Sequence, residues 1–247
     1  MARIDQNLVA EAIGLPPEDA IAYFEAKGFA ITWDWREQLL EANKQAFTVA
    51  KAMRMDVLQD IKGMVTKALQ EGLTLQDFRG ELAPKLWAKG WWGERRVEGP
   101  NGTEFVQLGS PHRLETIYRT NMQGAYMAGR REQQVEDAEE RPYLQYIAVA
   151  DASTRPEHMA MNGKIFPIND PIWDIWTPPC GYNCRCRTRA LTEEQAERRG
   201  GVARAPSEQP DPGFRFNPAV VDWTPDMRTY SPEIRRVAKD MEQKRAA

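Results

Sequence analysis

The stretch that decides the fold runs from Asp151 to Cys186 and reads DASTRPEHMAMNGKIFPINDPIWDIWTPPCGYNCRC. It contains all 3 cysteines of the chain and one of its 2 histidines, His158. A disulfide framework normally spreads its cysteines along a chain. Clustering near one end of this stretch therefore indicates either a metal site or small apolar side chains packed in a core.

The cysteine spacing defines a candidate metal site. If the segment is extended, Cys184 and Cys186 share one face of a strand, with Cα atoms about 7 Å apart, too far for an easy disulfide. A single Zn²⁺ accepts both thiolates, and His158 and Cys180 would complete a tetrahedral structural site. C-x3-C-x-C is not a standard zinc spacing, so a second interpretation stays open. In it the thiols are buried as small apolar groups, and His158 bonds Asp151 or the backbone.

Arginines alternate with these cysteines. On an extended strand Arg185, Arg187 and Arg189 would share the face opposite the thiols, and Arg198 and Arg199 follow shortly afterwards. Guanidinium groups on one face repel each other unless anions compensate for their charge. Two interpretations are open: contacts with phosphate groups, or ion pairs with the many acidic side chains of the chain.

Asp151, Thr154, Arg155 and His158 form a predicted polar cluster because they are close in sequence. Asp and His together could act as a general base. The sequence has no nucleophile elbow, no H-E-x-x-H motif and no phosphate-binding loop. We therefore favour a network that locks a turn, with Arg155 bonding carbonyl groups and Asp151 orienting His158, and keep catalysis as the alternative.

Upstream of this stretch the sequence predicts helices. From Trp35 to Glu71 apolar residues recur at three- and four-residue steps, which is typical of one long amphipathic helix. The pattern stops at Gly72. Thr74 with Asp77 three residues later then predicts the capping box of a further helix.

The middle of the chain predicts a hairpin, a helix and a strand in turn. Asn101-Gly102 between short mixed runs predicts a hairpin, and Ser110-Pro111 predicts the start of a helix that ends near Asp137. YLQYIAVAD follows as a predicted strand. Four shorter segments come after it, three of them extended and the last a charged helix: KIFPI, IWDIW, NCRCRTRAL and TEEQAERRG.

These patterns predict an α+β fold with three regions. Residues 1–93 form a helical N-terminal region, and residues 94–195 form a compact mixed α+β core. Residues 196–247 form a linker and an extended C-terminal arm that ends in a helix. The small, polar, proline-containing segment 200–211 predicts the linker.

Composition excludes several classes of protein. The 247 residues suffice for a core without disulfide staples. The net charge of -3 gives no general basic surface, which disfavours a pure DNA-binding module and restricts any DNA contact to a local patch. The sequence has neither a long apolar segment nor a signal peptide, so we expect a cytoplasmic protein without a membrane anchor.

The order Asp, T-R-P-E-H, N-G, a tryptophan-containing stretch and G-Y-N-C-R-C resembles the signature of the Mu F-like phage head morphogenesis family. AIAYFEAKG, LAPKLWAKGWWG, RLETIYRTN and FNPAVVDWTPDMRTY resemble the same family, so the likeness extends over nearly the whole chain. The resemblance implies a non-enzymatic minor head, or minor capsid, protein that acts in head morphogenesis. It would reside in the virion, and in the host cytoplasm during assembly.

The resemblance also implies partners. These are the portal or the major capsid proteins, at the portal vertex or the inner capsid, and double-stranded DNA packaged in the head. The alternative function is an enzyme carried in the head, either a metal-dependent nuclease or an ADP-ribosyltransferase-like effector. With only His112 and His158, the chain is poorly equipped for a histidine-rich nuclease site.

Overall fold

The structure is a computed structural model that describes residues 17–29, 46–52, 54–99, 102–215 and 217. The predicted C-terminal helix and the segment 30–45 lie outside the described residues. None of the described helices is both long and apolar enough to cross a membrane.

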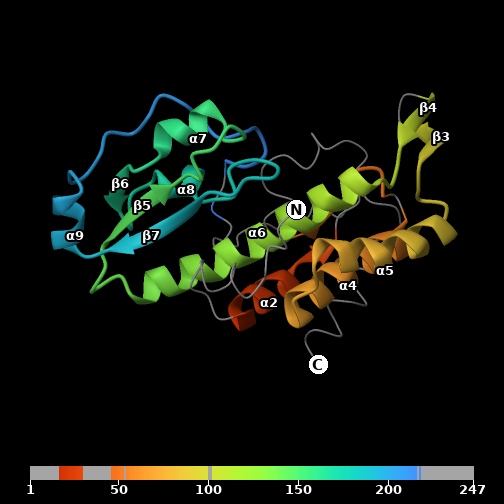
Figure 1. Cartoon of the computed structure of the whole chain (residues 1–247), viewed down its shortest axis with the longest axis horizontal. Coiled ribbons are helices and arrows are strands. Elements are labelled where there is room, and N and C mark those ends of the chain that lie inside the picture. The colour runs from red at the N-terminus through yellow and green to blue at the C-terminus, as the bar shows by residue number, and fades with distance from the viewer. Residues whose placement is uncertain (1–16, 30–45, 53, 100–101, 216, 218–247) are drawn as a thin grey trace, which may run out of the picture.

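Helices form one end of the molecule (Figure 1). Helices α2 (Pro17–Ala26), α4 (Met55–Glu71) and α5 (Leu75–Ala88) pack against α6 (Pro111–Glu136), and α2 reaches the second half of α6 at Gly129 and Gln133. Each contributes an apolar stripe to one core, as its sequence period requires. Side chains with no exposed surface in this core include Leu58, Ile61, Phe78, Leu82 and Leu114.

One helix prediction was wrong in part. Within the predicted helix from Trp35 to Glu71, residues Ala46–Phe47 form a short strand, β2, parallel to β1 (Gly28–Phe29), and the helix begins only at Met55. Lys51 has φ 61°, a left-handed conformation that a helix cannot include. Phe47 is nevertheless buried against Phe24, with ring centroids 5.7 Å apart. The apolar spacing thus identified core positions correctly but not their backbone conformation.

Several local predictions are confirmed. The side chains and backbones of Thr74 and Asp77 form the predicted capping box of α5. The predicted hairpin consists of β3 (Glu94–Gly99) and β4 (Gly102–Gln107), which pair antiparallel. Ser110 caps α6 by accepting a hydrogen bond from the backbone N–H of Arg113 at 3.1 Å.

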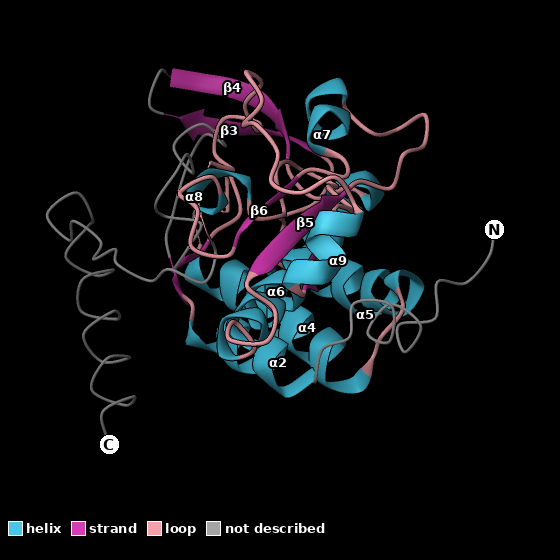
Figure 2. Cartoon of the chain, turned by 90° about the vertical axis from the view of Figure 1, so that its left-hand side faces the viewer, coloured by secondary structure: helices cyan, strands magenta, loops and turns pink. Residues whose placement is uncertain are grey.

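A three-stranded antiparallel sheet forms the other end of the molecule, on the left of Figure 1 and facing the viewer in Figure 2. Its order is β6 (Ile165–Pro167), β5 (Tyr143–Ile147), β7 (Arg187–Leu191). One face packs on α8 (Trp173–Trp176) and the cysteines, and the other packs on α9 (Glu193–Arg198). The segment IWDIW was predicted to be extended and is instead the helical turn α8. The Asp170 carboxylate accepts from the N–H of Ile172 at 2.9 Å and so starts this turn.

Helix α6 joins the two ends. Along its second half, Gln123 donates to the carbonyl of Cys186 at 2.7 Å and Arg130 donates to that of Thr188 at 2.9 Å. The Thr188 hydroxyl in turn donates to Gln134 at 3.0 Å. The helical core and the sheet confirm the α+β class. The division at residues 93 and 195 stays a prediction, because α6 contributes to both ends.

Gly129 of α6 provides a test of the contact between α2 and α6. A Cβ at this position would lie 2.8 Å from the Cβ of Asp19 and 3.2 Å from the backbone N of Ala20, whereas one at Gly124 would meet nothing within 4 Å. We expect Gly129→Ala to destabilise the protein by ~1–3 kcal/mol through overpacking. The matched control Gly124→Ala should stabilise it by ~0.5–1 kcal/mol through helix propensity. Urea unfolding measures both, and equal stabilisation by the two variants would contradict this helix contact.

Candidate functional site

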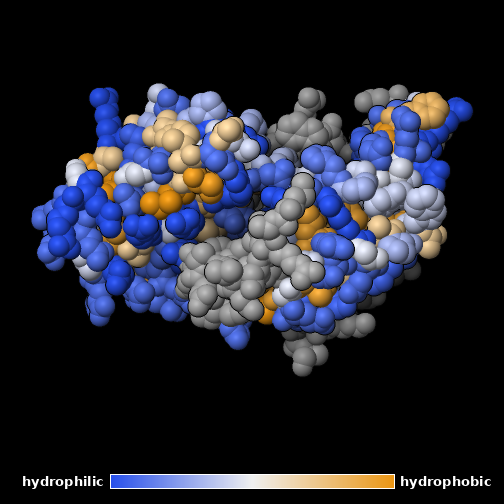
Figure 3. All heavy atoms as spheres, viewed as in Figure 1, coloured by the Kyte–Doolittle hydropathy of each residue, from blue (hydrophilic) through white to orange (hydrophobic). Residues whose placement is uncertain are grey.

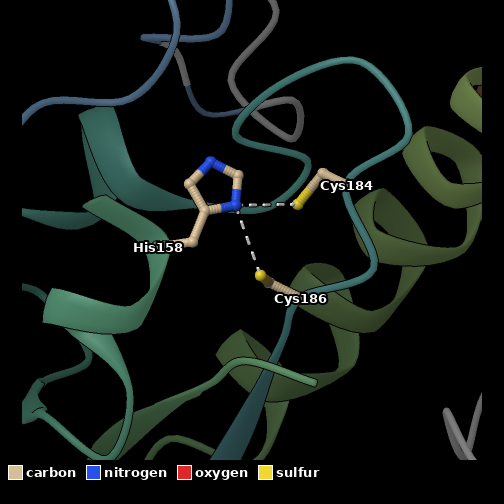
Figure 4. Close-up of side chains that lie close together, drawn as sticks. All are labelled: His158, Cys184 and Cys186. Carbon is tan, nitrogen blue, oxygen red and sulfur yellow. Dashed lines mark hydrogen bonds between the residues drawn. The ribbon is translucent and has the colours of Figure 1, made fainter. Parts of the chain in front are cut away.

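Three predicted metal ligands meet in the core of the sheet end. The Nδ1 atom of His158 lies 3.5 Å from the Sγ of Cys186 and 3.9 Å from the Sγ of Cys184 (Figure 4). These ligand atoms all lie within 4.8 Å of one another. The three residues are buried, with exposed fractions of 2%, 3% and 5% for His158, Cys186 and Cys184.

Two turns place these side chains. Pro156 occupies the first turn of α7 (Pro156–Met161), where its missing N–H costs nothing, and the helix directs His158 into the core beside Trp176. Opposite it, the Cys184 N–H donates to the Gly181 carbonyl at 3.1 Å, in a turn where Asn183 has φ 57°. This turn brings both thiols to the imidazole.

Hydrogen bonding sets the tautomer of His158. Its Nε2 lies 3.3 Å from the carbonyl oxygen of Cys180. A carbonyl can only accept, so Nε2 carries the proton and the Nδ1 lone pair faces the two sulfurs. This is the tautomer of a metal-ligating histidine, whose other ring nitrogen normally donates to a carbonyl or carboxylate. Without a metal, the same lone pair accepts from a thiol.

The fourth predicted ligand, Cys180, lies next to this group but outside it. Its buried thiol contacts the carbonyl of Trp176 at 3.6 Å. Contact with the Cys180 thiol, together with burial, raises the pKa of the Cys184 thiol to about 12. Burial, followed by the nearby cysteines, also raises the pKa of Tyr146, whose hydroxyl lies beside them. Contact with the Cys184 thiol, followed by burial, also raises the pKa of Cys186, so the Cys184 and Cys186 thiols are protonated at neutral pH unless a cation replaces their protons.

The predicted polar cluster divides into two parts. The Asp151 carboxylate accepts from both Nη atoms of Arg185 at 2.7 Å, from the Ser153 N–H at 3.0 Å and from the Thr154 hydroxyl at 3.1 Å. The hydrogen bonds from Arg185 lower the pKa of Asp151 to about 2. The prediction that Asp151 orients His158 was wrong, because Asp151 is in an exposed turn whereas His158 is on the buried side of α7.

Arg155 bonds a carbonyl, as predicted, since its Nη2 donates to Tyr182 at 3.0 Å. The same group forms an ion pair with Asp211 at 3.3 Å. The cavity between this turn and the cysteines has a volume of about 10 Å³. Such a space holds about one water-sized species and no organic substrate.

A segment that the sequence did not connect with the site closes it from outside. The Asp211 N–H donates to the Cys180 carbonyl at 3.1 Å, so this carbonyl serves both His158 and Asp211. Phe214 packs on Tyr182 with ring centroids 4.9 Å apart. A Cβ at residue 181 would lie 2.4 Å from the Asp211 carboxylate, so a larger residue there would displace that side chain. Nothing in the sequence spacing around Asp211 signals this contact.

The five predicted phosphate contacts have different partners and surroundings. Arg185 precedes β7 and is held by Asp151, and Arg198 pairs with Glu194 at 3.4 Å. Arg187 and Arg189 lie on β7 itself, half-buried. Arg199 is exposed at the end of α9. Only Arg187 and Arg189 lie within β7, which begins at Arg187, but burial alternates from Cys184 to Arg189 as the predicted extended segment requires.

Limited proteolysis tests the closing segment. We expect the first cut between residues 200 and 211, because this stretch has no helix or strand. Asp211→Ala removes the ion pair with Arg155 and should speed this cut severalfold. The control Glu208→Ala removes an exposed carboxylate of the same segment and should change the rate little. Equal rates for the two variants would contradict docking through Asp211.

Comparison with known proteins gives one family match and two similar proteins. A family profile described as Phage Mu protein F like protein matches residues 59–189, which include His158, Cys184 and Cys186. The chain is 48% identical over 193 residues to the "Putative capsid assembly protein F" of Escherichia phage Mu, an alignment that covers 78% of this chain and 44% of that protein. It is 47% identical over 170 residues to the "Mu-like prophage FluMu F protein" of Haemophilus influenzae, covering 69% of this chain and 40% of that protein.

The chain thus spans less than half the length of these curated relatives. No solved structure matches it. The matched region nevertheless takes in just over half of the chain. It includes α5, α6, β5, β6, the first residues of β7, and the segments that carry His158, Cys184 and Cys186. On this match, the chain belongs to the Phage Mu F-like protein family.

Proposed function

We propose that this protein is a component of a phage head that acts in head assembly, in the virion and without catalysis. The observation that carries the proposal is the 48% identity over 193 residues with a protein of phage Mu that is named a putative capsid assembly protein. Its partners would be the portal or the major capsid proteins, at the portal vertex or on the inner capsid surface. Packaged double-stranded DNA would be a further partner.

The geometry of the site supports a structural role. Every oxygen of Asp151 accepts a hydrogen bond, and a cavity of about 10 Å³ leaves no space for a substrate. A general base works best when its pKa is near the operating pH, whereas the hydrogen bonds from Arg185 lower the pKa of Asp151 to about 2. The rival function, a head-carried nuclease or ADP-ribosyltransferase-like effector, would need a reacting group elsewhere in the chain.

We also propose that His158, Cys184 and Cys186 hold a structural Zn²⁺, with Cys180 as the fourth ligand. Three donors of the types that zinc prefers converge in the core, and the imidazole presents its unprotonated nitrogen. Cys180 is adjacent to Cys184 and would reach the ion by turning its thiol away from Trp176. Such an ion would tie α7 to the segment that leads into β7. Buried free thiols are the alternative.

Metal analysis tests the zinc proposal. Protein purified without chelator should contain about one equivalent of zinc, and a chelator should lower the Tm. Zinc at a hundredfold excess over its Kd would contribute about 3 kcal/mol, or roughly 6–12 °C for a chain of this size. Absence of metal, together with no shift of the Tm on adding zinc, would exclude the site.

Cobalt substitution identifies the ligands. Co²⁺ bound by thiolates has a characteristic sulfur-to-metal absorption, whose intensity grows with the number of thiolates. Cys186→Ala should abolish binding at the site, whereas Cys180→Ala should weaken it and reduce the absorption by about a third. An unchanged spectrum for Cys180→Ala would show that Cys180 is not a ligand and that the site consists of His158, Cys184 and Cys186 alone.

Head incorporation tests the assembly proposal. Because Asp151 is engaged in an ion pair, Asp151→Asn should lower phage yield only as far as it lowers folding and incorporation into heads. The control Glu208→Gln removes one charge from an exposed position. Yield, chain content of purified heads and melting temperature are compared for both variants. If Asp151→Asn melts normally and enters heads but phage yield collapses, then the variant has lost a catalytic activity. The enzyme interpretation would then replace the assembly proposal.

Electron microscopy of assembled heads tests the partners. We expect density for this chain at the portal vertex or on the inner capsid surface. If the mature head lacks this chain, but deletion of the chain still impairs assembly, then the role of the protein would be restricted to a transient stage of assembly.

A further inference from the structure

The outer edge of β7 meets α6 at a group of three arginines. Arg187 and Arg189 are two residues apart on the strand, so their side chains leave it on the same side. Arg130 of α6 reaches this edge, and its Nε donates to the carbonyl of Thr188, between the other two, at 2.9 Å. Figure 1 shows β7 running beside α6, and in the same view the surface of this end of the molecule is mainly hydrophilic (Figure 3).

The charge of this group is not balanced. Within the part of the chain that the structure describes, Arg130, Arg187 and Arg189 form no ion pair, although Arg155, Arg185 and Arg198 each have a carboxylate partner. Burial, and then repulsion from Arg187 and Arg189, lowers the pKa of Arg130 to about 10. Three cations therefore lie close together, partly withdrawn from water, and no acid among the described residues pairs with them.

One donor atom of this group also lacks an acceptor. The Nη1 of Arg130 is buried, and no hydrogen-bond partner is found for it among the described residues. A buried donor left without an acceptor costs about 1–3 kcal/mol, and more when it is charged. The group thus combines excess positive charge with an unused N–H at the junction of β7 and α6.

We propose that Arg130, Arg187 and Arg189 bind a phosphate group. Guanidinium forks match the oxygens of phosphate in pairs, and a phosphate offers acceptors to several arginines at once. A carboxylate offers two oxygens and one negative charge, which suits a single arginine, as Asp151 and Arg185 illustrate here. This phosphate site does not depend on the proposed head function. If the protein does act in a phage head, the DNA backbone is the natural source of the phosphate group.

This proposal divides the five arginines that the sequence suggested. Arg185 and Arg198 are occupied by carboxylates, and Arg199 lies apart on α9. Arg187 and Arg189 remain, and α6 adds Arg130, which is 57 positions upstream of Arg187 and which no local pattern connects to them.

The test uses the full chain and a short fluorescein-labelled DNA duplex, with binding followed by anisotropy at several salt concentrations. The double variant Arg187→Gln/Arg189→Gln should bind about tenfold more weakly or worse, with the slope of log K against log salt reduced by about two. The matched control Arg198→Gln/Arg199→Gln removes the same charge from the neighbouring helix and should stay within twofold of the natural protein. Melting temperatures show that both variants are folded.

Inorganic phosphate serves as the second probe and separates the two sources of the group. In one outcome, phosphate competes with the duplex and also raises the Tm of the natural protein but not that of the Arg187/Arg189 variant. This pair of results supports the site, with DNA as the source of the phosphate group. The same Tm effect without any duplex binding supports the site with free phosphate as its ligand.

Three results would overturn the proposal. Equal losses in the two double variants would mean that binding follows net charge rather than this geometry. No binding of the duplex and no effect of phosphate would mean that the arginines hold no phosphate. Polyglutamate that competes better than phosphate would assign the group to carboxylates of a protein partner. Failure in any of these ways leaves the head proposal intact, because incorporation into heads is measured separately.

Discussion

The hydrogen bond from His158 Nε2 to the Cys180 carbonyl is the contact on which the sheet end of the molecule depends. A buried imidazole needs partners for both nitrogens, and this bond leaves Nδ1 facing Cys184 and Cys186. It thereby fixes α7 against the turn that leads into β7. The same carbonyl accepts from Asp211, so the outer segment docks on the atom that orients the imidazole.

A second constraint is that the outer edge of β7 must be covered, and helix α6 covers it. A three-stranded sheet leaves unpaired backbone groups on its outer strands, which favour pairing with other chains unless they are covered. Gln123 of α6 donates to the carbonyl of Cys186, just before β7, and Arg130 donates to that of Thr188 within it, so α6 covers this edge. Because α6 also packs against α2, α4 and α5, the same helix joins the sheet to the helical core.

The burial of the cluster limits what it can do. Catalytic metal sites keep an open position for substrate, whereas structural sites are closed by protein ligands. His158 and the cysteines lie in the core, with Trp176 and Tyr146 around them and the segment around Asp211 outside. The arginines of β7 lie nearer to solvent, so contacts with other molecules are better sought at that edge than at the cysteines.

The sequence by itself determined the local structure of this protein: the capping box at Thr74, the hairpin at Gly102 and the cap at Ser110. These follow from turn chemistry and from residues close along the chain. It offered the meeting of His158 with two cysteines only as one of two interpretations. Only the tertiary structure decided that Asp151 holds Arg185, that Asp211 closes the site and that Arg130 joins Arg187. Those partners are separated by tens of residues, and the packing of α6 and of the closing segment, rather than any local pattern, brings them together.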